Sequence, residues 1–80
     1  MSSKETPRRR DLDNAATLER ARKRIAAVGK AENFDFMRED KAIAQGWISA
    51  LHVEALLSKE QYEVLDAELD KAADEWEQPV

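Results

Sequence analysis

The final third of the chain contains a narrow apolar seam that only a helix can form. Its apolar residues recur at steps of 3, 4, 3 and 4: Tyr62, Leu65, Leu69, Ala72 and Trp76. This alternation follows the repeat by which helices pack along one line, but about two heptads are too few for a long coiled coil. Other helices of the same chain are therefore expected to cover the seam. The nearest is the preceding helix, which predicts an antiparallel hairpin.

The start of this helix has a strong local signal. Ser58 is followed three residues later by Gln61, the spacing of a capping box. In that motif, each of the two side chains accepts a hydrogen bond from the backbone N–H of the other residue. The pattern predicts a helix over residues 59–77, ended by Pro79.

Two earlier segments show the same kind of periodicity, over residues 13–30 and 36–56. The first carries an apolar stripe at Leu18, Ala21, Ile25 and Val28. The second carries a broader one at Ile43, Ala44, Trp47, Ile48, Leu51 and Ala55. Steps of three and four place each set on one helix face. The fold class is therefore all-α, a small three-helix domain over residues 13–78.

Several residues between these helices have expected structural roles. Asp13 or Asn14 is the candidate N-cap of the first helix, and Gly29 is expected to end it in a left-handed conformation. The connector "NFDFM" (residues 33–37) is apolar enough that one of its phenylalanines should enter the core. Gly46 costs about 1 kcal/mol relative to alanine inside a helix, which close approach of another helix would explain.

The N-terminal segment and the composition narrow the protein class. Residues 1–12 contain Pro7, Arg8, Arg9 and Arg10 but few apolar side chains, so a disordered basic arm is expected. The chain has no cysteine, which excludes disulfides and thiol chemistry. No apolar run is long enough for a signal sequence or a membrane span, so a cytoplasmic protein is expected.

The charges are segregated along the chain. Residues 1–30 hold nine basic and four acidic groups, whereas residues 31–80 hold four basic and thirteen acidic groups. On the first helix one basic arc is formed by Arg20, Lys23, Arg24 and Lys30. With Arg8, Arg9 and Arg10 these are the possible phosphate contacts of a nucleic-acid-binding protein. The arc has neither an amide side chain to read bases nor an aromatic to stack on them, so a solvated face is the simpler interpretation.

The third helix has the opposite charge. Six carboxylates share one arc beside its apolar seam: Glu60, Glu63, Asp66, Asp70, Asp74 and Glu77. Like charges at these spacings repel, by a few tenths of a kcal/mol per pair. Three arrangements would offset the repulsion: the basic face of the first helix alongside, the basic helix of a second copy, or a cationic partner that the stripe binds as a mimic of DNA.

The sequence contains no sign of an active site or a cofactor site. His52 is the only histidine, and no carboxylate is placed to orient its ring. "DLDNAATLE" starts like a calcium loop, but Ala16 and Arg22 occupy the positions that require glycine and glutamate. We therefore expect no enzymatic activity, no metal, no cofactor and no small-molecule substrate.

The leading functional hypothesis is a small non-enzymatic interaction or regulatory module that works through helix–helix contacts, as a homodimer or with a protein partner. Its expected interface anchors are Trp47, Tyr62, Leu65, Leu69 and Trp76. Trp76 lies close to the chain end and is the strongest candidate to face a partner. The alternatives are a nucleic-acid-binding accessory protein that uses the basic arm and first helix, or an acidic DNA-mimic inhibitor that uses the third helix.

Overall fold

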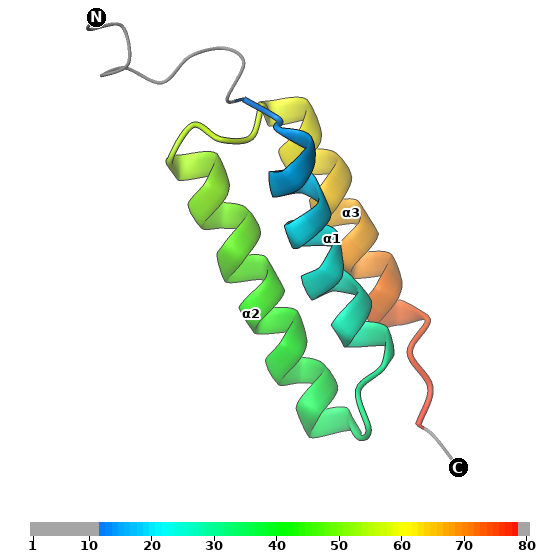
Figure 1. The fold of residues 1–80 in the computed structure, drawn as a ribbon. Helices are drawn as coiled ribbons and strands as arrows, with labels where there is room; N and C mark the ends of the chain where they lie inside the picture. Colours follow the sequence, from blue (N-terminus) through cyan, green and yellow to red (C-terminus); the bar gives the residue numbers. More distant parts are fainter. Residues whose placement is uncertain (1–11, 79–80) are drawn as a thin grey trace, which may run out of the picture.

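The computed structural model describes residues 12–78, which form a bundle of three helices. These are α1 (Ala15–Gly29), α2 (Phe34–Val53) and α3 (Lys59–Asp74). Each helix contacts the other two, and α2 runs opposite to both α1 and α3 (Figure 1). The predicted all-α, three-helix fold is confirmed. The predicted basic arm lies outside the described residues except for Leu12, and none of the three helices combines the length and apolarity needed to cross a membrane.

The core runs along the centre of the bundle and draws on every helix. Its fully buried larger side chains are Val28 of α1, Ile48 of α2 and Leu65 and Leu69 of α3. Burial of such a side chain stabilises the fold by about 1.5–3 kcal/mol. No polar or charged residue between residues 12 and 78 is buried. The apolar seam recognised in the sequence is thus the α3 contribution to this core.

Helix α2 begins earlier than predicted because Asn33 caps it. The Asn33 side-chain oxygen accepts a hydrogen bond of 2.8 Å from the Phe36 backbone N–H. The first turn of α2 therefore includes Phe34 and Phe36, whose side chains remain 52% and 49% exposed. Met37 fills the core at this end instead. The expectation that a phenylalanine would do so is wrong.

The C-terminus of α2 has a left-handed residue that is not glycine. The Leu56 N–H donates to the Leu51 carbonyl at 2.8 Å, and the Ala55 N–H donates to the His52 carbonyl at 3.0 Å. These two bonds define a Schellman motif, and Ala55 has the required positive φ of 63°. The helix therefore ends three residues before the predicted boundary at residue 56. Gly29, by contrast, is the last residue of α1 and has no positive φ.

At the end of the bundle that holds the α2–α3 loop, Asp13 joins the start of α1 to that loop. Its N–H donates to the Leu56 carbonyl at 2.9 Å, and its Oδ1 accepts from the Ser58 N–H at 2.9 Å. The Ser58 hydroxyl caps α3 by accepting from the Gln61 N–H at 3.1 Å. Half of the predicted capping box is therefore present, and Asp13 rather than Gln61 accepts the other bond. The N-cap of α1 is Asn14.

Trp76 forms a contact at the opposite end of the bundle. Helix α3 ends at Asp74, three residues before the predicted boundary at residue 77. The chain then turns, and the Trp76 indole Nε1–H donates to the Ala31 carbonyl at 3.0 Å. The Trp76 ring also lies 6.2 Å from the ring of Phe34, centroid to centroid. Trp76 thus closes this end of the core instead of extending the helix.

Candidate docking surface on helices α1 and α2

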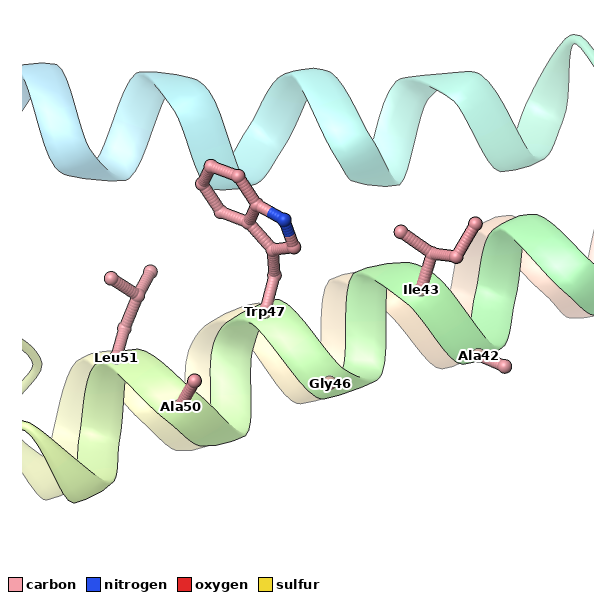
Figure 2. Close-up of a pocket in the computed structure, with 6 residues that line it drawn as sticks. All are labelled: Ala42, Ile43, Gly46, Trp47, Ala50 and Leu51. Atoms are coloured by element: carbon pink, nitrogen blue, oxygen red, sulfur yellow. The ribbon is translucent and has the colours of Figure 1, made fainter.

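An open groove runs along the outer face of α2. We call its lining the α2 strip: Ala42, Ile43, Gly46, Trp47, Ala50 and Leu51 (Figure 2). Two rows spaced four residues apart form it, one of small residues and one of large apolar residues. The groove has a volume of about 420 Å³. It is a shallow apolar surface on a regular helix.

Gly46 lies in the strip with free space around it. A Cβ atom built on Gly46 would have nothing within 4 Å beyond its immediate surroundings in the helix. The expected close approach of another helix at this glycine is therefore absent within residues 12–78. Figure 2 shows Gly46 between Ala42 and Ala50 along the helix, with Ile43 and Trp47 on the neighbouring row.

The strip is free of formal charge. Residues 42–53 contain no Asp, Glu, Lys or Arg. Ile43 is 49% exposed, Trp47 is half-buried, and Val53 just beyond the strip is exposed. An apolar surface bordered by polar residues is typical of an interaction site. Between residues 12 and 78, the other large exposed apolar residues, Phe34, Phe36 and Val64, lie outside the strip.

A basic groove on α1 adjoins the apolar one. Its lining comprises Ala27, Trp47 and three cations that we call the basic row, Arg20, Lys23 and Arg24, and its volume is about 260 Å³. The Arg24 guanidinium lies over the Trp47 ring, 4.7 Å from its centroid. This cation–π contact holds the Arg24 charge at the edge of the apolar surface. Figure 2 shows the Trp47 ring reaching from α2 to α1, so Trp47 belongs to both grooves.

The ion pairs lie on other faces of the bundle. Arg22 Nε and Nη2 donate to Glu68 Oε1 and Oε2 at 3.0 and 2.9 Å, which joins α1 to α3 in a two-point contact. These hydrogen bonds raise the pKa of Arg22 and lower the pKa of Glu68. A longer pair at 3.8 Å joins Lys41 to Asp70. Both pairs are well exposed, and such pairs contribute about 0–1 kcal/mol each.

Within residues 12–78, the predicted basic arc and acidic stripe do not pair with each other. No ion pair in this part of the chain includes Arg20, Lys23 or Arg24. Among the residues that the structure describes, Asp70 alone of the acidic stripe has a cationic partner, Lys41 on α2. Helix α1 does lie alongside α3, as the first of the three arrangements has it, but the one ion pair between them is Arg22–Glu68 in this part of the chain, which includes neither the basic arc nor the acidic stripe. Lys30 is the C-cap of α1, and Arg8, Arg9 and Arg10 lie outside the described residues.

The five predicted interface anchors lie in different parts of the structure and differ in exposure. Leu65 and Leu69 are 0% exposed, so in this fold they hold the bundle together and have no surface to offer a partner. Tyr62 is half-buried and stacks on His52, with ring centroids 4.6 Å apart. Trp76 contacts Ala31 and Phe34, as described above, so the prediction that it faces a partner is not supported by its position. Of the five, Trp47 alone lines the two grooves.

His52 contacts the α2–α3 loop and the first turns of α3. Its Nδ1 lies 3.3 Å from the Leu57 carbonyl oxygen, within reach of a hydrogen bond from Nδ1–H. Its ring stacks on Tyr62 across the α2–α3 contact. In the part of the chain that the structure describes, no three histidine or carboxylate side chains gather in a way that could hold a metal ion.

Sequence reasoning missed the contact between Trp47 and Arg24. The sequence assigned Trp47 to an apolar stripe and Arg24 to a basic arc that lacked an aromatic residue. The two meet because α1 and α2 pack side by side, which no local spacing reveals. No protein-family model, curated protein or solved structure matches the chain. The apolar and basic grooves described above are therefore the features that indicate a function.

Proposed function

We propose that the chain is a small non-enzymatic protein-interaction module that docks a helix of another molecule on the α2 strip. The observation that carries this proposal is the open groove over an uncharged stretch of helix, with Gly46 at its centre. Small residues on one row allow another helix to come close, while Ile43 and Trp47 on the other row supply apolar contact area. A tryptophan at the centre of such a surface is a typical anchor of binding energy.

The mode of binding is an amphipathic helix laid along a groove. A docked helix contributes residues at spacings of three and four, which match the fourfold spacing of the two rows of the strip. A second copy of the chain is one possible source of that helix, which would make the protein a homodimer, as expected from the sequence. The interface then centres on Trp47 rather than on the α3 seam.

The test uses a neutral amphipathic peptide helix with a leucine stripe and glutamine elsewhere. The peptide is titrated into the 15N-labelled full chain, and amide shifts are followed by NMR. We expect the shifts to concentrate at residues 42–51 and to disappear in the Gly46→Gln variant, whose side chain fills the groove. Ala67→Gln, on the exposed face of α3, is the matched control and should bind like the unmodified chain. Shifts elsewhere, or binding unaffected by Gly46→Gln, would refute the proposal.

Nucleic-acid binding is the second candidate function, and one observation favours it. Trp47 places an aromatic ring within the basic row, where stacking on a base and contact with phosphates would be adjacent. In this case Arg20→Gln with Arg24→Gln should weaken binding of single-stranded DNA and flatten its salt dependence. Absence of binding by the unmodified chain at low salt would exclude this function. The acidic DNA-mimic alternative stays a prediction.

A further inference from the structure

We infer that the helix docked on the α2 strip belongs to a different polypeptide and is acidic along the edge that faces α1. The partner is thus an amphipathic helix with an apolar stripe bordered by carboxylates. This inference rests on the proposed function and specifies the chemistry of its partner. The arrangement that supports it is the basic row beside the apolar groove, with Trp47 shared by both.

The basic row supplies uncompensated positive charge along one edge of the strip. Arg20, Lys23 and Arg24 are exposed, and no acidic side chain among residues 12–78 forms an ion pair with any of them. A helix that covers Trp47 must also cover part of this edge, because Arg24 lies over the Trp47 ring. Covering a charge without pairing it is unfavourable, so a partner with carboxylates at this edge binds better than a neutral one.

The spacing of the cations defines a pattern on the partner. Arg20 lies one helical turn from Lys23 and Arg24, a rise of about 5–6 Å. Carboxylates three or four residues apart on a helix have the same spacing. A helix lying along α2 would then present apolar residues to Ile43 and Trp47 and carboxylates to the basic row. The apolar residues and the carboxylates would both recur at helical spacing, so a single docked helix can contact the α2 strip and the basic row together.

A second copy of the chain fits this site poorly. Two copies that meet strip to strip present the same surface to each other. That surface has no carboxylate across residues 42–53, and the first carboxylates along its two rows, Glu39 and Glu54, lie one turn beyond its ends. The acidic stripe of α3 does not provide the apolar stripe either, because Val64 is the only large apolar side chain of α3 with substantial exposure, at 42%. Charge and apolar area together therefore favour another polypeptide.

The experiment compares three peptide helices with the same leucine stripe and with glutamate, glutamine or lysine along one edge. Each is titrated at low salt into the 15N-labelled full chain. We expect the glutamate peptide to bind about tenfold more tightly than the glutamine peptide, since two or three exposed ion pairs multiply to that factor. The lysine peptide should bind most weakly. Added salt should remove the difference between the glutamate and glutamine peptides.

Two double variants identify the charges responsible. Arg20→Gln with Arg24→Gln leaves Lys23 as the last cation of the basic row and should remove most of the preference for glutamate over glutamine. Lys59→Gln with Lys71→Gln removes the same net charge from exposed positions of α3 and should retain the preference. Loss of the preference in both double variants would mean that net charge, and not the basic row, attracts the peptide. That result would overturn the inference.

The remaining outcomes separate this inference from the proposed function. Equal affinities for the three peptides at the strip would overturn the inference and leave the proposed function standing. No peptide binding at the strip would overturn both. Sedimentation that shows a dimer of the chain alone, lost in Gly46→Gln, would assign the strip to a second copy. Displacement of the glutamate peptide by single-stranded DNA, with binding of that DNA lost in Arg20→Gln with Arg24→Gln, would assign the site to nucleic acid.

Discussion

Replacement of Ala55 by glycine should stabilise the protein, although glycine usually destabilises. Ala55 follows the C-cap of α2 and has a φ of 63°. In this left-handed region the Cβ atom of an alanine approaches its own backbone too closely, whereas glycine has no Cβ. The Ala55 side chain is exposed, so its removal loses no packing. The substitution thus changes the backbone conformational energy and leaves the side-chain packing nearly unchanged.

The size of the gain follows from two opposing terms. Relief of the left-handed conformation is favourable by about 1–2 kcal/mol. Glycine also has greater conformational freedom in the unfolded chain, which favours unfolding and offsets about 0.4–1 kcal/mol of that gain. With the middle value of each range, the net gain in the free energy of unfolding is about 0.8 kcal/mol, which raises the melting temperature of a domain of this size by about 3–6 °C.

Thermal unfolding followed by circular dichroism measures this gain, with Ala67→Gly as the matched control. Ala67 is also exposed but lies inside α3, where φ is negative. The same chemical change there should cost about 1 kcal/mol and lower the melting temperature by about 4–8 °C. The two variants should therefore move in opposite directions. If Ala55→Gly lowers the melting temperature as Ala67→Gly does, the backbone at residue 55 is not left-handed and the reasoning fails.

Three further predictions concern single contacts. Gly46→Ala should raise the free energy of unfolding by about 1 kcal/mol, because alanine favours the helix and its methyl group meets nothing within 4 Å. Urea denaturation measures this free energy, and a decrease would show that the methyl group clashes with a neighbour. Trp76→Phe should lower the free energy of unfolding by about 1 kcal/mol, because the Ala31 carbonyl loses its hydrogen-bond donor. An unchanged free energy in urea denaturation would mean that this hydrogen bond contributes nothing to stability. Arg22 lowers the pKa of Glu68, so the ion pair stabilises the fold above the ordinary glutamate value of 4.5 and this contribution is lost as pH falls through the lowered pKa. Glu68→Gln should therefore reduce, by less than about 1 kcal/mol, the loss of unfolding free energy that acidification causes. If the unfolding free energy of the variant falls with acid as much as that of the unmodified chain, the ion pair does not stabilise the fold.

The helices were predictable because their determinants are local. The spacing of Leu65 and Leu69 and the cap at Ser58 depend on residues within two turns, so the sequence was sufficient to place α3. The helix ends were less predictable. The sequence pattern predicted a left-handed glycine, Gly29, at the end of α1, whereas the left-handed residue in the structure is Ala55, after the C-cap of α2. Propensity alone does not show which helix end is left-handed.

The candidate site was predictable only in part. Trp47 was one of the predicted interface anchors, but its neighbour Arg24 comes from another helix and is 23 positions earlier in the sequence. Trp76 was the strongest candidate for a partner contact because it lies near the chain end, yet the turn after α3 brings it back over the core. Periodicity identifies the apolar face of a helix. It does not show whether that face is covered by the same chain.

The hydrogen bonds of Asp13 and Trp76 together fix the register of the bundle. Each joins residues 45 positions apart, and they lie at opposite ends of the helices. Apolar contacts are non-directional, so seams of alanine, leucine and isoleucine tolerate sliding of one helix along another. A slip of α1 by a single turn, about 5.4 Å, would break both bonds at once. The two clamps thus hold α1 in the alignment that brings Arg24 over Trp47.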